Sequence, residues 1–277
     1  MVLQVLDLNQ ELTMLSVSRI LLPMDFSDRC MGMLPYARAV AAKYGAELIL
    51  LHVENEDELA KVGRERHQDI DVRRVLYDGD PADVIVGFVK SEKIDLIAMP
   101  THGYGVFRRF LIGSVTAKVL HDVSCPVLTG VHMEEQPAPS LAEFSNVLCA
   151  IDLGAQSADV LKWATQLATE FHAQFGVVHA LPPLSPGLEL LFASDWRAEV
   201  ANMARKDVET LVSAIGPGAA AVYIQEGEPA KTVCSFAKAM GADLLVIGRG
   251  PRDRVGGRLT THSYAVIRQS PCPVISI

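Results

Sequence analysis

The stretch RILLPMDFSD (residues 19–28) shows how the chain is organised, because it recurs as NVLCAIDLGA (146–155). In both copies an apolar run ends on an aspartate, Asp25 in the first and Asp152 in the second. A short apolar run followed by turn residues is typical of a strand buried on both faces of a sheet. Because internal repeats mark repeated structural units, the recurrence predicts two copies of one domain.

Four further matches follow in the same order along the chain. They pair AELILLHV (46–53) with AQFGVVHA (173–180), YDGDPADVI (77–85) with QEGEPAKTV (225–233), DLIAMP (95–100) with DLLVIG (243–248), and SCPVLTG (124–130) with PCPVISI (271–277). Prolines and acidic residues without periodicity indicate a linker between the copies. The predicted organisation is an N-terminal extension (1–16), a first domain (17–132) with a shortened crossover after its second strand, a linker (133–145) and a second domain (146–277).

Apolar runs alternate with helical patterns in each copy, which predicts an α/β fold with a doubly wound parallel sheet and helices on both faces. In the first copy the expected strands lie near residues 18–24, 47–53, 72–77, 95–99 and 126–131. A helix is expected over 28–44, with Ser27 or Asp28 as N-cap and Gly45 as its stop. Pro35 inside it predicts a kink or a late start.

The charge and cysteine content exclude several classes of protein. A net charge of −8 argues against nucleic acid as a partner, because the phosphate backbone requires a basic face. No apolar run reaches the roughly 20 residues of a membrane span, and the first residues make a poor signal peptide. The five cysteines are odd in number and show no C-x-x-C spacing. Reduced thiols in a cytoplasmic protein are therefore expected.

The predicted ligand site lies at the carboxyl ends of the first and fourth strands. Doubly wound sheets bind ligands there, where the strand order reverses. Gly103 would let the backbone approach a ligand, and Gly113 and Ser114 begin a helix whose free N–H groups attract anions. His102 could touch a phosphate or lie exposed. The alternative is that these glycines only turn the chain.

Taken together, these motifs resemble the universal stress protein family. The resemblance rests on Asp25 after the first strand, LLHV in the second, GDPA (79–82) before a helix, THGYGVFRRFLIGS (101–114) after the fourth strand and CPVL (125–128) in the last. It implies a Rossmann-like, five-stranded parallel sheet of order 3-2-1-4-5 in each copy. Many members bind ATP through G-2x-G-9x-G-(S/T), and members that lack this motif do not.

The resemblance assigns roles to residues of the first copy. Those implied to bind nucleotide are Asp25 and Val53 at the adenosine, Gly103 in the loop, and Gly113, Ser114, Val115 and Thr116 at the phosphates, and His102 beside Gly103 is a further candidate. The first family glycine falls on Pro100, which has no N–H group to donate. The loss of one hydrogen bond costs about 0.5–1.5 kcal/mol, so binding would be weakened and not abolished.

The second copy departs further from the family pattern. Its candidate nucleotide-binding residues are Asp152, Gly248, Gly250, Thr260 and Thr261. Threonine replaces the glycine that allows close approach at position 260. Arginines also crowd the loop, at positions 249, 252, 254 and 258. They either hold phosphate directly or form a solvated basic loop.

Three functions remain open at this point. The first is a non-catalytic, regulatory stress-response protein that binds an adenine nucleotide (ATP, ADP or AMP), with or without Mg²⁺. The second is a nucleotide-free interaction or scaffold module, and the third is a weak ATP hydrolase. No catalytic motif or metal-ligand spacing supports an enzyme. Because a bare last strand invites pairing, the copies are expected to form an intramolecular pseudo-dimer through CPVLTG (125–130) and CPVISI (272–277), and a homodimer of whole chains remains open.

Overall fold

The computed structural model describes residues 16–53, 71–102, 112–130, 144–183, 194–216, 220–250 and 259–277. The first half of the chain contains β1 (Arg19–Met24), α1 (Asp28–Tyr44), β2 (Glu47–Val53), β3 (Val72–Tyr77), α3 (Pro81–Ser91), β4 (Leu96–Pro100), α4 (Ser114–Asp122) and β5 (Val127–Gly130). The second half contains β6 (Asn146–Ile151), α5 (Ser157–Glu170), β7 (Gln174–Leu181), α7 (Ser194–Ile215), β8 (Ala221–Glu226), α8 (Pro229–Ala239), β9 (Leu244–Ile247), α9 (Thr261–Gln269) and β10 (Val274–Ser276). The crossover expected over 54–70 lies outside the described residues.

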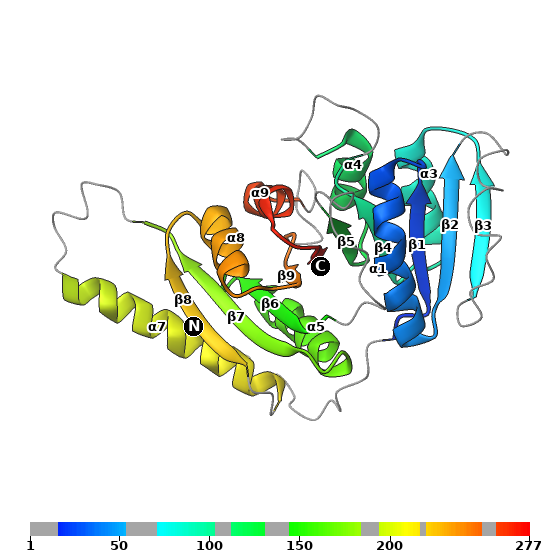
Figure 1. The fold of residues 1–277 in the computed structure, drawn as a ribbon. Coiled ribbons are helices and arrows are strands. Elements are labelled where there is room, and N and C mark those ends of the chain that lie inside the picture. The colour runs from blue at the N-terminus through cyan, green and yellow to red at the C-terminus, as the bar shows by residue number, and fades with distance from the viewer. Residues whose placement is uncertain are drawn as a thin grey trace.

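The strands form one sheet of ten, in the order β3-β2-β1-β4-β5-β10-β9-β6-β7-β8. Pairing is parallel within each half, and each half has the order third, second, first, fourth, fifth. The predicted fold class is confirmed, and the two five-stranded sheets are continuous with each other. The halves lie side by side with the carboxyl end of the chain between them (Figure 1).

The halves meet where β5 pairs antiparallel with β10, with Leu128 opposite Ile275. Side-chain hydroxyls add to this ladder: Thr129 Oγ1 donates to the Val274 carbonyl and Ser276 Oγ donates to the Val127 carbonyl, each at 3.3 Å. On one face of the sheet an aromatic cluster spans the joint. Phe144 stacks on Tyr36 of α1 and meets Phe171, which directly follows α5.

Helices cover both faces of the sheet, as the alternating pattern predicts. Successive strand residues point to opposite faces, so Ile20 and Leu22 enter one buried cluster and Leu21 enters the other. The first cluster packs against α1, α5 and α7, and the second against α3, α4, α8 and α9. None of the helices in the described ranges combines the length and apolar character that crossing a membrane requires.

Local signals in the sequence set the ends of the helices. Ser27 caps α1 by accepting from the Cys30 N–H group, and Gly45 ends it with a φ of 62°, the left-handed conformation that glycine adopts without strain. Asp80 caps α3, with Pro81 at the first helical position. The late start expected from Pro35 is wrong, because α1 already begins at Asp28.

All five cysteines are free thiols, and only Cys125 is not fully buried. Burial raises the pKa of Cys30 to about 12 and that of Cys272 to about 11. Because the thiolate is the reactive species, alkylation of the native protein with iodoacetamide at pH 8 should modify Cys125 roughly tenfold or more faster than these two. Peptide mass spectrometry over time measures the rates, and denatured protein provides the control. Equal native rates at Cys30 and Cys125 would contradict the fold.

Candidate functional site

The candidate site lies where the sheet order reverses, between β1 and β4. These strands are parallel neighbours, so their carboxyl ends lie at one edge of the sheet. In the first half their pairing covers only two positions, Ile20 with Leu96 and Leu21 with Ile97. The equivalent strands β6 and β9 pair over four positions. The pairing of β1 with β4 therefore ends earlier along the strands than the pairing of β6 with β9. It ends toward the edge of the sheet where such folds bind ligands.

Pro100 is the last residue of β4 and is buried. It lies beyond the two positions at which β4 pairs with β1, so its missing N–H group removes no bond from that ladder. Its carbonyl accepts a hydrogen bond from Thr116 Oγ1 at 3.0 Å. The residue thus holds the first turn of α4 against the end of the strand.

Asp25 directly follows β1 and is half-buried. Its Oδ1 accepts from the backbone N–H group of Ser27 at 3.0 Å and from Ser27 Oγ at 2.7 Å. The next residue, Phe26, has a φ of 58°, which is rare for a bulky residue and marks local strain. Its ring lies edge-on to His52, with centroids 4.8 Å apart. This contact anchors the strained turn to the core.

The same turn occurs in the second half. Asp152 Oδ1 accepts from the Gly154 N–H group at 2.8 Å and from Ser157 Oγ at 3.2 Å, and Leu153 has a φ of 60°. The two strand-end histidines are structural: His52 Nδ1 lies 2.7 Å from the Met24 carbonyl, and His179 Nδ1 lies 2.9 Å from the Ile151 carbonyl. Each therefore ties the end of its half's second strand to the first.

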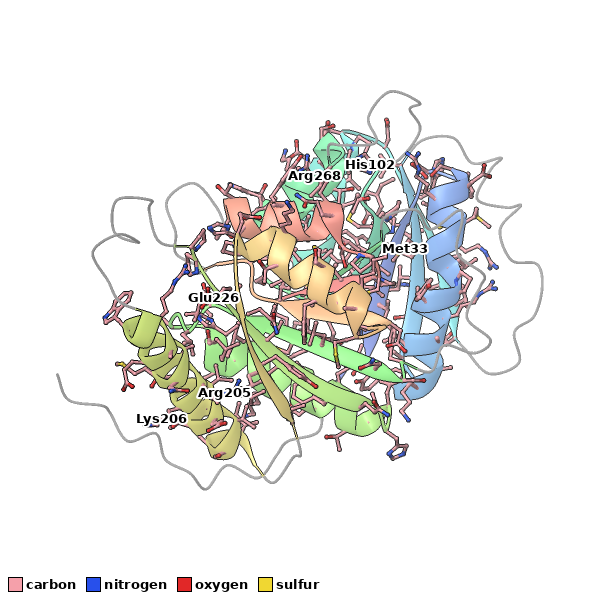
Figure 2. All side chains as sticks on the ribbon, turned by 60° about the vertical axis from the view of Figure 1, so that its left-hand side comes forward. Met33, His102, Arg205, Lys206, Glu226 and Arg268 are labelled. Carbon is pink, nitrogen blue, oxygen red and sulfur yellow. The ribbon has the colours of Figure 1, made fainter. Side chains whose placement is uncertain are left out.

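The start of α4 is held beside the end of β4. The N–H group of Gly113 donates to the Thr101 carbonyl at 2.8 Å, and the N–H group of Thr101 pairs with the Gly130 carbonyl of β5 at 3.2 Å. His102 is buried, with Nδ1 2.9 Å from Thr101 Oγ1. The alternative of an exposed His102 is therefore wrong (Figure 2 labels this residue). Gly103 lies outside the described residues, and Val53 ends β2 in a half-buried position.

Among the described residues, the first turn of α4 has no side-chain cap. Gly113 is its N-cap residue and provides no side-chain hydrogen bond. The first intrahelical bond runs from the N–H group of Ala117 to the Gly113 carbonyl. The N–H groups of Ser114, Val115 and Thr116 therefore have no acceptor within the helix, as at any helix start. Aligned donors and the helix dipole together favour an anion at this point.

The first turn of α9 is closed by its own side chain. Thr260 matches Gly113, and its hydroxyl accepts from the Ser263 N–H group at 3.1 Å. Ser263 Oγ in turn donates to the Gly248 carbonyl at 2.8 Å, as Thr116 does to Pro100. Thr261 is exposed at the helix start, and Gly250 has a φ of 135°. The two halves thus share the backbone arrangement and differ in whether the helix start is capped.

Arg249 contradicts both interpretations of the second loop, as a phosphate ligand or as a solvated residue. Its side chain is fully buried. Nη1 donates to the Leu120 carbonyl at 2.9 Å and Nη2 donates to the Cys125 carbonyl at 2.6 Å. Both acceptors belong to the first half, at the end of α4 and just beyond it. The other three arginines of this loop lie outside the described residues.

Tyr264 is a residue of the site region that sequence reasoning missed. It lies in α9, and its hydroxyl accepts from the N–H group of Ile112 in the first half at 3.0 Å. Ile112 directly precedes Gly113, so a side chain of one half contacts the helix start of the other. Comparison of the two copies offers one signal for Tyr264, because the matching position in the first copy is Ala117, which has no hydroxyl.

Fold and site together define a tandem Rossmann-like α/β protein with a candidate anion site at the start of one helix. The universal stress protein family matches residues 54–129 and 143–277. The chain therefore belongs to the universal stress protein family.

Individual relatives agree with this assignment. A universal stress protein of Thermus aquaticus is 30% identical over 130 residues, which cover 39% of this chain and 95% of the relative. One of Methanocaldococcus jannaschii is 27% identical over 135 residues, covering 40% of this chain and 79% of the relative. The crystal structure of a universal stress protein from Archaeoglobus fulgidus covers 94% of this chain and 98% of its own, with a TM-score of 0.69 and 24% identity.

The difference between the two caps predicts unequal costs of substitution. Thr260→Ala removes the acceptor of the Ser263 N–H group and should lower the free energy of unfolding by about 1 kcal/mol. Gly113→Ala is the matched control at the equivalent position. It removes no cap, and alanine's Cβ would meet the Thr101 carbonyl oxygen at an ordinary 3.5 Å. Urea unfolding of both variants measures the difference, and an equal loss in both would contradict the assigned caps.

Proposed function

We propose that the first half binds an adenine nucleotide (ATP, ADP or AMP) with its phosphates at the start of α4. The observation that carries the proposal is the uncapped first turn after Gly113, beside the end of β4. Phosphate oxygens would accept from the N–H groups of Ser114, Val115 and Thr116 and gain from the helix dipole. The Ser114 hydroxyl is exposed at the same helix start and adds a further donor.

Within the described residues, packing gives no reason for glycine at position 113. Its φ of −58° is open to any residue. A Cβ built there would meet its nearest neighbours at 3.5 Å or more, which is ordinary contact. A phosphate bound at the amides of the first turn would come close to such a Cβ, so the proposed ligand gives a reason for the glycine.

The remaining contacts of the nucleotide follow from the family resemblance. Asp25 and Val53 at the ends of β1 and β2 would hold the adenosine, and Gly103 with His102 would line the loop beside the phosphates. The carboxylate of Asp25 is oriented by Ser27, which donates to one of its oxygens twice. Mg²⁺ would accompany a triphosphate as its counter-ion.

We propose a regulatory, non-catalytic role in the stress response for this nucleotide site. The second half would serve as a scaffold for the nucleotide site of the first half. In the second half the Thr260 hydroxyl already accepts from the Ser263 N–H group, one of the donors that a phosphate would need. Among its candidate residues Asp152 keeps the turn after β6, whereas Gly248 and Gly250 follow β9, and Thr260 and Thr261 lie at the capped start of α9. The hydrogen bonds between β5 and β10 favour an intramolecular pseudo-dimer of the two predicted domains. A cytoplasmic location stays a prediction from the cysteine pattern.

Gly113→Thr tests the site by copying the second half into the first. The new hydroxyl should accept from the Thr116 N–H group, as Thr260 does from Ser263, and compete with phosphate for that donor. We expect unchanged or slightly raised thermal stability, together with at least roughly tenfold weaker binding of ATP. Isothermal titration calorimetry and thermal unfolding measure the two quantities.

The controls separate the hydroxyl from the added carbon. Gly113→Ala adds only Cβ and should weaken ATP binding less than Gly113→Thr does. Thr260→Ala, in the capped second half, should leave ATP affinity unchanged. Wild-type protein that gives neither heat nor a thermal shift at millimolar ATP, ADP and AMP would reject the proposed function.

A further inference from the structure

Two side chains of the second half reach the same short segment of the first half. Tyr264 contacts the segment that leads into α4, at the N–H group of Ile112. Arg249 contacts its other end, at the carbonyls of Leu120 and Cys125. These partners lie more than 120 residues apart in sequence.

Each contact fits the local electrostatics of a helix. The last carbonyls of a helix have no intrahelical donor and carry the negative end of its dipole. A buried guanidinium of Arg249 satisfies one of them, that of Leu120, together with the Cys125 carbonyl just beyond the helix. At the opposite end, the Tyr264 hydroxyl satisfies the amide of Ile112 and so fixes the backbone one residue before Gly113.

The bracing runs in one direction only at these positions. Arg249 matches Thr101, whose short side chain bonds within the first half, to the Gly130 carbonyl and His102. Tyr264 matches Ala117, which has no hydroxyl. The first half therefore offers α9 no equivalent contact from either matched position. The second half therefore holds both ends of α4, the helix whose N-cap residue provides no side-chain cap.

We propose that Tyr264 and Arg249 are positioning residues that act across the joint to hold the phosphate-binding amides of the first half. The proposal rests on the proposed nucleotide site and adds a task for the second half: it keeps α4 at a fixed position against β4. Three donors must point at one phosphate together, so a small displacement of residues 112–116 weakens all of them. Adenosine, which has no phosphate, would not sense such a displacement.

Tyr264→Phe tests this positioning role, because it removes one oxygen and keeps the ring. We expect roughly three- to tenfold weaker binding of ATP and AMP, and unchanged binding of adenosine. Arg249→Lys, which cannot form the forked pair of bonds, should have the same selective effect. Tyr44→Phe is the matched control, because Tyr44 also packs across the joint, against Phe171 on the opposite face. It should change neither affinity.

A second measurement needs no nucleotide. Amide hydrogen exchange of the ligand-free protein should be roughly three- to tenfold faster at residues 112–116 in Tyr264→Phe and unchanged in α9. Wild-type exchange in that variant, or equal losses of ATP and adenosine affinity, would overturn the positioning role. If wild-type protein binds no nucleotide, the proposed function fails and the positioning role fails with it, whereas exchange still shows whether Tyr264 braces α4. ATP binding with wild-type affinity in Tyr264→Phe would overturn the positioning role alone.

Discussion

Every helix start presents N–H groups that need acceptors, and this requirement distinguishes the two halves of the molecule. In α9 a threonine hydroxyl meets part of the need from within the protein. In α4 glycine stands at the same place and provides no side-chain acceptor. Within the described residues, the strand end and the first turn match in the two halves, down to the hydroxyl that ties each first turn to the preceding strand. One side chain therefore separates a helix start that its own N-cap residue caps from one that its N-cap residue leaves uncapped.

The two copies form one continuous sheet and yet differ in how their last helices begin. The last strands join the sheets, an aromatic cluster fills one face of the joint, and Arg249 with Tyr264 crosses it on the other. A buried guanidinium is costly unless it is well satisfied. The end of a helix offers carbonyls and a favourable dipole to meet that cost. The arginine thus contributes to the joint in a place where an apolar residue would leave carbonyls without donors.

Much of the fold could be predicted because its signals are local. Apolar runs, the caps at Ser27 and Asp80 and the stop at Gly45 each act within a few residues. The burial of Arg249 could not be predicted, since arginine beside three others in a glycine-rich loop is ordinarily solvated. Its partners depend on how the halves pack, and so do those of Tyr264. Thr260 was a readable signal, because threonine before a helix commonly caps it.

The antiparallel meeting of β5 and β10 also limits how whole chains can assemble. Within the described residues, the strand edge that each half would otherwise present there is consumed inside one molecule. A second chain cannot add to the sheet at that line without first opening the joint. Strand-to-strand growth is left to β3 and β8, which lie at the two ends of the sheet. Contacts between chains that avoid those ends must use helices or loops. Joining the two copies in one chain therefore places inside the molecule a strand edge that could otherwise pair with a second chain.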